Sequence, residues 1–274
     1  MATTIFTPSM LRGAGTRGVP EIPVTSAGFT NTYSMAFDGI DDRINVGSGS
    51  SISPTDEITL SCWINAQSLA FYDPFFYYGW PGTSPKGGYW LSGGVWSNGW
   101  LYLKFGFGDG VDRHEQGSHQ VSGASLNTWY HIVATYDGAD ANMYVDANRV
   151  NGFSWGGGSG SISYRAGDTL DIAGNQTDGN FFFPGFLDEA AVWDVALDVD
   201  TITSIYNQGT PNDLTLAASY TSGSGVDKSG NLGGWWRMGD KISGATIPDQ
   251  SGNGNDGTNT GSPPLAVITG SIPS

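Results

Sequence analysis

The chain has 274 residues, of which 42 are glycine, 13% are aromatic and only 14% are charged. This mixture suits many short strands joined by tight turns, and it is too aromatic for a disordered polymer. The formal net charge is −15 with only 11 lysine and arginine residues, which argues against a nucleic-acid partner and makes divalent cations the natural counter-ions. The single cysteine, Cys62, excludes an intramolecular disulfide.

The N-terminal part of the chain lacks the marks of a targeting signal or of a packed element. No run approaches the roughly 18 apolar residues of a membrane span, and the first residues contain no apolar core of signal-peptide length. We therefore expect neither membrane insertion nor export by the Sec route. Residues 1–30 contain three prolines and no hydrophobic period, which predicts an extended N-terminal arm.

From residue 33 onwards, apolar residues recur at every second position in several segments. This period places alternate side chains on opposite faces of an extended chain, and it predicts β-strands and an all-β fold. The clearest segments are AFDGIDDRINVG (36–47), EITLSCWINA (57–66), LYLKFGFG (101–108), NTWYHIVATYDG (127–138), NMYVDANRVNG (142–152) and TLDIAG (169–174). No internal repeat of fixed period is visible, which argues against solenoids and propellers.

The segment GFLDEAAVWDVALDVDTITSIYNQG (185–209) joins a strand to one short helix. Strict alternation predicts that Asp188 and Glu189 point to opposite faces of a strand buried between two layers. Asp198 suits the N-cap of the helix, because its side chain accepts hydrogen bonds from the first turn. Gly209 supplies a left-handed stop at the C-terminal end.

Taken together, the segments at 36–47, 57–66, 127–138, 169–174 and 185–209 resemble the laminin G-like, concanavalin A-like lectin/glucanase superfamily, of the kind found in tailed-phage virion proteins. The resemblance implies a two-sheet antiparallel jelly-roll sandwich with one short helix and one concave face. It also implies a bound calcium ion, which is common in proteins of this superfamily.

One segment departs from the family pattern. In many relatives a piece like WRMGD…DQSGNGNDGT precedes the FDG strand, whereas here it follows the helix, at residues 235–258. Because the termini of a sandwich lie close together, either end of the chain can supply a strand. We therefore predict that residues 234–240 pair into the main sandwich beside the FDG strand. The predicted division is an arm (1–30), a sandwich (31–209), a connector with the returning strand (210–258) and a C-terminal tail (259–274).

The acidic residues do not form a convincing catalytic set. Retaining glucanases of this fold use acids at alternate positions on one strand, so that both side chains enter the cleft. Asp188 and Glu189 are adjacent, which does not match that spacing. The sequence around His114, Glu115 and His119 lacks the spacing of a zinc protease, and no serine lies in a nucleophile elbow. We therefore predict a protein that is not an enzyme.

Carboxylates near the FDG strand are better placed to bind calcium, which prefers hard oxygen ligands. Asp38, Asp41 and Asp42 fall within five residues, and Asp188 begins a second acidic segment. We predict a calcium site formed by Asp38, Asp41 and Asp188. The alternative is that Asp38 forms an Asx turn around Gly39 and the other acids are solvated. Residues 249–256 hold a rival oxygen cluster, which is more often a simple turn.

Aromatic residues are dense between residues 71 and 107, and most of them must fill the core of the sandwich. Five lie beside loop glycines or prolines and are predicted to stack on sugar rings: Trp80, Tyr89, Trp90, Trp96 and Trp100. Asn98 and Asp109 are candidate partners for sugar hydroxyls. The same rings also suit packing against another protein. His131 alternates with apolar residues in a strand, so we interpret it as a buried structural histidine.

Two functions remain open. The first is a non-enzymatic virion component of a tailed phage, a capsid decoration or fibre protein held to other virion proteins by residues 1–30. In this form we expect a homo-oligomer located in the virion, with polysaccharide as a further partner. The second is a free carbohydrate-binding module or adhesin, located outside the cell or on its surface, with the aromatic loops as its binding surface.

Overall fold

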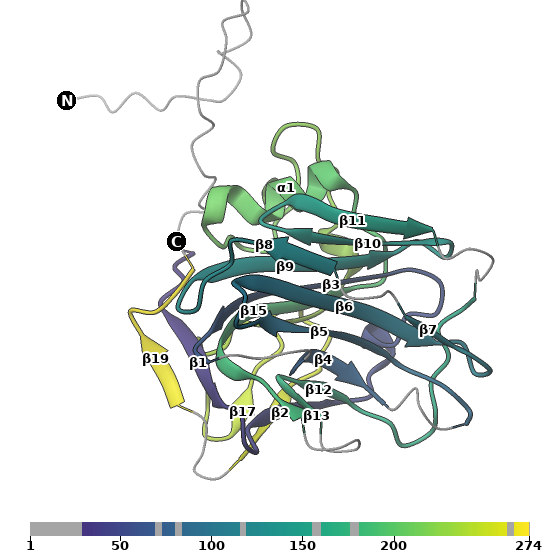
Figure 1. Ribbon diagram of the computed structural model, residues 1–274, viewed down its shortest axis with the longest axis horizontal. Coiled ribbons are helices and arrows are strands. Elements are labelled where there is room, and N and C mark those ends of the chain that lie inside the picture. Colours follow the sequence, from purple (N-terminus) through teal and green to yellow (C-terminus); the bar gives the residue numbers. More distant parts are fainter. Residues whose placement is uncertain are drawn as a thin grey trace, which may run out of the picture.

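The computed structural model describes residues 29–68, 73–79, 84–115, 119–154, 160–175, 181–261 and 266–273. Two large sheets form a sandwich, and every strand pair in this part of the chain is antiparallel. The α-helix α1 (Val199–Tyr206) lies at the top of Figure 1, next to β10 and β11. The prediction of an all-β, two-sheet antiparallel jelly-roll sandwich with one short helix is confirmed.

Sheet A has the strand order β11-β10-β9-β3-β15-β1-β19, and β16 pairs with part of β15. Its strands are β1 (Tyr33–Asp38), β3 (Ile58–Ala66), β9 (Trp129–Tyr136), β10 (Asp140–Val145), β11 (Asn148–Ser154), β15 (Pro184–Trp193), β16 (Leu232–Trp236) and β19 (Ala266–Thr269).

Sheet B has the order β17-β18-β2-β12-β4-β5-β6-β7, with β8 paired to β6. Its strands are β2 (Arg43–Gly47), β4 (Asp73–Tyr78), β5 (Tyr89–Val95), β6 (Trp100–Gly108), β7 (Arg113–Glu115), β8 (His119–Ser122), β12 (Leu170–Ile172), β17 (Thr246–Ile247) and β18 (Gly257–Thr260). A separate ribbon pairs β13 (Gly174–Asn175) with β14 (Phe181–Phe182). Short 3₁₀ turns occur at Ser50–Ile52, Asn207–Gly209, Ala217–Ser219 and Ser229–Asn231.

The main core lies between the two sheets. It contains Leu60, Cys62 and Ile64 of β3 together with Leu103 and Phe105 of β6, all fully buried. Alternation explains this set, because every second side chain of each strand enters the space between the sheets. The single cysteine, Cys62, is a fully buried thiol of this core, and burial raises its pKa well above the usual value.

A second core lies on the outer face of sheet A, beneath α1 and the connector that follows it. Trp193 of β15, Ile202 of α1 and Tyr220 of the connector are buried there. The Trp193 indole N–H donates to the Tyr220 hydroxyl at 3.1 Å, and that hydroxyl donates to the Leu214 carbonyl at 2.7 Å. The strand at β15 is therefore buried on both faces, as its sequence predicted.

The helix begins as predicted but ends earlier. Asp198 caps α1, since its Oδ1 accepts the N–H of Thr201 at 2.7 Å. Asn207, and not Gly209, is the C-cap: it adopts the left-handed conformation with a φ of 48°. Asparagine is one of the few residues that tolerate this conformation. Within the described residues, no helix has the length and apolar character needed to cross a membrane.

A β-bulge in β15 overturns the prediction that Asp188 and Glu189 face opposite ways. The register with β3 shifts between Asp188 and Ala191, and Glu189 has a φ of 50°. Asp188 lies opposite Trp63, which points away from the main core, and Glu189 accepts a hydrogen bond from Trp235 in the second core. Because the bulge inserts one residue, both carboxylates lie on the outer face of sheet A.

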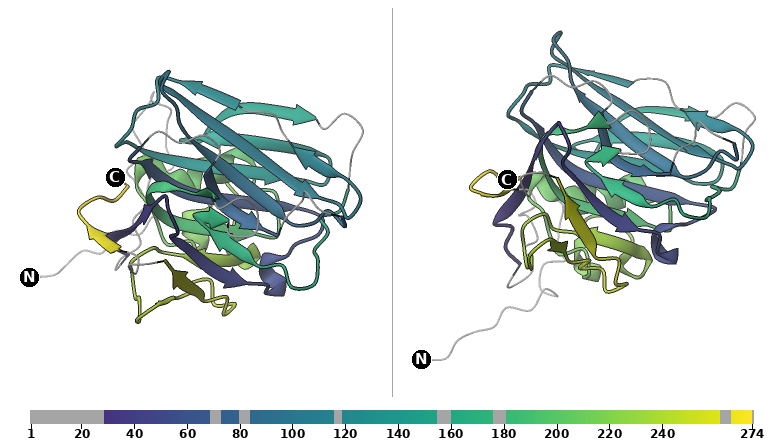
Figure 2. Two further views of the ribbon diagram at one scale, coloured as in Figure 1. Left: turned by 60° about the horizontal axis from the view of Figure 1, so that its bottom comes forward. Right: turned by 90° about the horizontal axis from the view of Figure 1, so that it is seen from below.

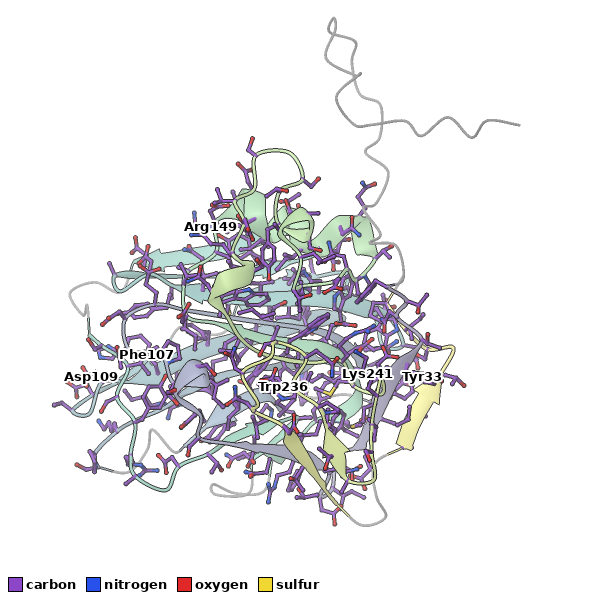
Figure 3. The ribbon with its side chains drawn as sticks, turned by 180° about the vertical axis from the view of Figure 1, so that it is seen from behind. Tyr33, Phe107, Asp109, Arg149, Trp236 and Lys241 are labelled. Atoms are coloured by element: carbon purple, nitrogen blue, oxygen red, sulfur yellow. The ribbon has the colours of Figure 1, made fainter. Side chains whose placement is uncertain are left out.

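Segments near the C-terminus complete both sheets. Strand β16 pairs with residues 190–193 of β15, while β1 pairs with residues 184–187, so the two strands follow one another along the same edge. Strand β16 thus enters the sandwich without pairing with β1 itself. The Trp236 indole, near the middle of the molecule in Figure 3, donates to the Asn255 carbonyl at 2.8 Å. Part of the predicted tail forms β19, which lies beside β1 (Figure 2).

Candidate functional site

The β5–β6 hairpin separates its core residues from its outward residues by alternation. Tyr89, Leu91 and Val95 of β5 and the odd-numbered residues 101–107 of β6 lie in the main core. The residues between them face outwards from sheet B, because successive side chains of a strand point to opposite faces. The side chains that share this outward face are Trp90, Ser92, Trp96, Trp100, Tyr102 and Lys104. We call this surface the hairpin face.

Trp90 lies flat across the neighbouring strand because residue 106 is glycine. The two residues are paired across β5 and β6, and a Cβ at position 106 would lie 2.1 Å from the Trp90 ring. The Arg113 guanidinium lies over the indole at 4.7 Å from the ring centre, a cation–π arrangement. Trp90 is consequently only 3% exposed.

The open part of the hairpin face is at the β5–β6 turn. The Trp96 N–H donates to the Trp100 carbonyl at 2.9 Å, which places the two indoles side by side on one face. Trp96 is 42% exposed and Trp100 is half-buried. Asn98 holds the turn, since its Oδ1 accepts the Trp100 N–H and its Nδ2 donates to the Tyr102 hydroxyl at 2.9 Å.

Ion pairs frame the hairpin face on both sides. On one side Glu115 pairs with both Lys104 and Arg113. On the other, Asp171 of β12 pairs with Arg43 at 3.1 Å and accepts a hydrogen bond from Asn45 at 2.7 Å. These contacts hold the charged side chains in fixed positions around the aromatic residues.

The structure places some of the predicted sugar-binding aromatic residues on the hairpin face and one of them in the core. Trp96 and Trp100 are neighbours on the hairpin face, Trp90 shares that face but lies six residues away from Trp96 along β5, and Trp80 is outside the described residues. Tyr89 requires a correction. It points into the main core, is fully buried, and donates its hydroxyl to the Ile52 carbonyl at 2.9 Å. Because Tyr89 and Trp90 are consecutive residues of β5, their side chains point to opposite faces of sheet B. The Tyr89 ring therefore faces the core and is not available to a ligand.

The two residues predicted to bind sugar hydroxyls, Asn98 and Asp109, lie at opposite ends of β6. Asn98 lies at the open end of the hairpin face. Asp109 lies at the far end of β6, next to Phe107 (Figure 3), and organises its own loop. Its carboxylate contacts His114 Nε2 at 2.7 Å and accepts the N–H groups of Val111 and Asp112. Partial burial opposes ionisation there, but these hydrogen bonds lower the Asp109 pKa to about 2.

The predicted calcium residues are separated into two groups. Ligand atoms of Asp38, Asp41 and Asp42 lie within 4.8 Å of one another. The Asx turn also forms, because Asp38 Oδ1 accepts the Ile40 N–H at 2.7 Å and Gly39 has a φ of +76°. The Asx turn and the cluster of acidic ligand atoms therefore occur in the same loop.

Asp42 gives this loop a feature that favours a cation. Its side chain is buried, its Oδ2 accepts the Asp38 N–H at 3.0 Å, and its Oδ1 has no hydrogen-bond partner among the described residues. Burial raises the Asp42 pKa, and the neighbouring Asp38 and Asp41 charges act in the same direction. A divalent cation would satisfy the unpaired oxygen and offset the repulsion.

The structure does not bring Asp188 to that loop. Asp38 pairs with Pro184, so Asp188 lies four residues further along β15, about 13 Å away. Asp188 is fully buried, where it accepts hydrogen bonds from Asn31 Nδ2 and the Glu189 N–H, both at 2.8 Å. This pairing places Asp188 too far from the loop to share a calcium ion with Asp38 and Asp41, so the prediction of Asp188 as a ligand is wrong.

Glu189 and Arg237 form a buried ion pair beside Asp188. Arg237 Nε lies 3.1 Å from Glu189 Oε1, and the Trp235 indole donates to Glu189 Oε2 at 2.6 Å. Burial raises the pKa of Glu189 to about 7, although Arg237 acts against it. Burial also raises the Asp188 pKa, and the Glu189 charge raises it further. This cluster lies on the side of sheet A away from the hairpin face.

The oxygen cluster at residues 249–256 and His131 both have structural roles. In the loop at 249–256, Asp249 accepts hydrogen bonds from the backbone of Trp235, Ser251 and Asn255, so this oxygen cluster is a turn that anchors β16. His131 is buried as expected, with Nε2 at 2.8 Å from Ser61 Oγ. Burial lowers its pKa to about 3, so the ring is neutral.

Sequence analysis missed Arg113, Lys104, Tyr102 and Gly106. The alternation in LYLKFGFG already assigned the last three to one face, opposite the apolar residues. Arg113 had no such signal, because its position over Trp90 depends on the register between β6 and β7.

Comparisons with known proteins agree with this fold. The family model of the concanavalin A-like lectin/glucanases superfamily matches residues 38–203, more than half of the chain. A putative carbohydrate-binding protein from Bacteroides ovatus ATCC 8483 superposes with a TM-score of 0.60 at 18% identity, covering 89% of this chain and 62% of that one. The chain thus spans less than two thirds of that protein.

Two other solved structures are similar to the chain. A heptameric SAP-like pentraxin from Limulus polyphemus has a TM-score of 0.51 at 18% identity, covering 64% of this chain and 82% of that one. Tailspike protein 2 of bacteriophage CBA120 has a TM-score of 0.48 at 15% identity, covering 82% and 35%. None of the curated proteins matches the chain in sequence. At these identities the likeness shows the fold alone.

Proposed function

Because the chain belongs to the concanavalin A-like lectin/glucanase superfamily, we propose that it is a non-enzymatic glycan-binding protein that uses the hairpin face. The observation that carries the proposal is the pair of outward indoles at Trp96 and Trp100, beside the Asn98 amide and the Tyr102 hydroxyl. Flat aromatic faces next to a few fixed polar groups are suited to the apolar faces and hydroxyls of sugar rings.

The framing charges favour a glycan that carries acidic as well as neutral groups. Arg113 and Lys104 border the aromatic row, in a chain whose net charge is −15. An acidic sugar approaching elsewhere would meet repulsion, whereas here it meets two of the few cations. This directs binding to one face of the molecule.

The arrangement of the carboxylates supports binding without turnover. Asp188 and Glu189 are buried beneath the helix layer, away from the hairpin face. Glu115 and Asp171, which border the hairpin face, are both engaged by cations. A glycosidase needs one carboxyl that donates a proton and a second that acts on the sugar.

A glycan array tests this proposal. We expect reproducible binding by the wild-type chain that is lost in Trp96→Ala and Trp100→Ala. Leu216→Ala is the matched control, because Leu216 is 40% exposed and lies in the connector on the other side of the molecule. Equal signals from all four proteins would contradict the proposed site. Release of reducing ends from the bound glycan would contradict the non-enzymatic role.

We also propose that calcium binds the loop formed by Asp38, Asp41 and Asp42. The unpaired, buried Oδ1 of Asp42 supports this, since nothing else among the described residues satisfies it. The ion would hold the loop between β1 and β2 in one conformation. It is a structural ion in this proposal and takes no part in glycan binding.

A second candidate function concerns assembly. Residues 29–31 are fixed to sheet A: the Arg237 guanidinium lies 4.2 Å from the Phe29 ring centre and donates to the Thr30 carbonyl at 2.8 Å. The anchoring of residues 29–31 supports the prediction that the arm at residues 1–30 attaches the sandwich to a larger particle, as a capsid decoration or fibre protein of a virion. A free carbohydrate-binding module or adhesin is the alternative. Particle incorporation that survives deletion of residues 1–28 would contradict attachment through this segment, and a wild-type chain that joins no particle would favour the alternative.

A further inference from the structure

A polar cavity lies on the side of the molecule opposite the hairpin face. It has a volume of about 300 Å³ and is formed where the turn between β10 and β11 meets the C-terminal end of α1. Asp146, Ala147 and Asn148 line it from the turn, and Thr203, Tyr206 and Gln208 line it from the helix end. Figure 1 shows α1 beside this strand pair. We call this cavity the helix-end cavity.

The backbone on both sides of the helix-end cavity is in the left-handed region. Asp146 and Ala147 have φ values of 49° and 60°, and Asn207 and Gln208 have values of 48° and 57°. Glycine takes such conformations without steric cost, whereas alanine and glutamine do not. Ala147 and Gln208 are therefore strained, and strained residues cluster at ligand sites, where the surrounding structure holds them in place. Half of the eight non-glycine residues with positive φ in the described chain lie around this one cavity.

A stack of three rings fixes the floor of the cavity. Tyr206 stacks on Trp63 with ring centres 5.7 Å apart and on His131 with centres 5.8 Å apart. Trp63 and His131 are themselves buried and 4.8 Å apart. Tyr206 is half-buried, so its ring is held by the stack but still borders the cavity. A rigid aromatic floor of this kind loses little entropy when a ligand binds.

The polar groups of the cavity suit a neutral ligand with several hydroxyls. Asp146 Oδ1 accepts the His131 N–H at 2.9 Å, and its Oδ2 has no hydrogen-bond partner among the described residues. The lining contains this one carboxylate together with amide and hydroxyl groups, and no lysine or arginine. An anionic ligand would be repelled, whereas hydroxyl groups can donate to the carboxylate. The volume is at the lower end of small-molecule sites, which fits one sugar ring and not a chain.

We propose that the helix-end cavity is a second binding site for a single neutral sugar residue, such as the terminal residue of a glycan branch. This inference rests on the proposed glycan-binding function, because it assigns the same ligand class to another face. Two sites on opposite faces make one chain bivalent. A bivalent chain links two glycan strands, or binds one surface with higher avidity than either site alone.

Isothermal titration of the full chain with the methyl glycosides of glucose, galactose, mannose and N-acetylglucosamine tests the proposal. We expect Asp146→Asn to weaken binding of at least one of these probes ten-fold or more. The substitution keeps the oxygen that accepts the His131 N–H, so the fold should be retained. Asp140→Asn is the matched control, since Asp140 is exposed at the other end of β10. Thr203→Trp is a second variant that fills the cavity from an exposed helix position.

The outcomes separate this inference from the proposed function. A methyl glycoside whose binding is weakened by Asp146→Asn and by Thr203→Trp, but not by Trp96→Ala, supports the helix-end cavity. Binding that responds to Trp96→Ala alone overturns the second site and leaves the hairpin face intact. Loss of methyl glycoside binding in Asp146→Asn, with no effect of Trp96→Ala on the binding of any glycan, supports the helix-end cavity and contradicts glycan binding at the hairpin face. No binding of any probe by the wild-type chain overturns the inference.

Discussion

The Arg113 guanidinium lies 4.7 Å above the centre of the Trp90 ring, and this contact joins the charged frame of the hairpin face to its aromatic row. Arg113 is held in turn by Glu115, which also pairs with Lys104. A ligand with an acidic group can engage Arg113 at this position. A neutral ligand stacks on the open indoles of Trp96 and Trp100.

Gly106→Ala should disturb this arrangement. A Cβ at that position would lie 2.1 Å from the Trp90 ring and 2.5 Å from the His114 carbonyl, so the indole must move. Overpacking of this kind costs about 1 to 3 kcal/mol. We expect a lower urea midpoint and a shifted tryptophan emission. Gly230→Ala is the control, because a Cβ there meets no atom within 4 Å. Equal urea midpoints for the two variants would contradict the flat packing of Trp90.

The buried pair of Asp188 and Glu189 predicts that stability falls as the pH rises. Burial raises the folded-state pKa of both carboxyls, so the folded protein favours their protonated forms. This contribution is fully present below the unfolded-state values of about 4. It is lost as the pH rises through the folded-state values, which for Glu189 is about 7. We expect the melting temperature to decrease between about pH 5 and pH 8.

Asp188→Asn should reduce that decrease, because it removes one of the two charges. Asn31 accommodates the new amide by turning its own side chain, since its Oδ1 has no hydrogen-bond partner among the described residues. Thermal melts monitored by circular dichroism at several pH values give the comparison. A wild-type melting temperature that stays level or rises over this range would show that the pair is ionised without cost.

Calcium removal should destabilise the loop between β1 and β2. EDTA removes a cation that neutralises Asp38, Asp41 and Asp42, and leaves the Asp42 Oδ1 buried without a partner. We expect the melting temperature to fall after chelation and to recover when calcium, but not sodium, is added. In Asp42→Asn the response to EDTA should be absent. A wild-type melting temperature that does not respond to EDTA would rule out the calcium site.

Arg237→Met should loosen the anchoring of residues 29–31. Arg237 pairs with Glu189 and with Asp240 and covers Phe29, so its loss leaves the buried Glu189 carboxylate without a cation. Removing one partner of a buried ion pair costs about 3 to 5 kcal/mol. Limited proteolysis should cut after Phe29 sooner in this variant than in Lys241→Met, since the Lys241 amine donates to Gln250 in an exposed hydrogen bond. Equal rates of cleavage would show that Arg237 does not hold this segment.

The sequence allowed the fold class, the helix cap at Asp198 and the outward faces of LYLKFGFG to be predicted, because each depends on neighbouring residues alone. The positions of Asp188 and Glu189 could not be predicted by alternation. The bulge at Glu189 depends on how β15 pairs with β3, which no local pattern encodes. For the same reason Asp188 was assigned to the calcium loop, although pairing places it about 13 Å away along the strand.

In the candidate site, too, some residues could be predicted from local sequence and others depend on how the strands pair. Trp96 and Trp100 were identifiable from their glycine-rich turn, whereas Tyr89 was included because it lies beside loop glycines, although alternation places it in the core. Arg113 reaches Trp90 only through the pairing of β6 with β7. Side chains brought together by strand register are visible only in the folded chain.

The most direct test of the central claim is the affinity of Trp96→Ala for the glycan that the wild-type chain binds on an array. Trp96 supplies the most exposed indole of the hairpin face, and Leu216→Ala removes a similar exposed apolar group elsewhere. Titration calorimetry should show that Trp96→Ala weakens binding at least ten-fold, about 1.4 kcal/mol, while Leu216→Ala leaves it unchanged. Equal affinities for Trp96→Ala, Leu216→Ala and the wild-type chain would contradict glycan binding at the hairpin face.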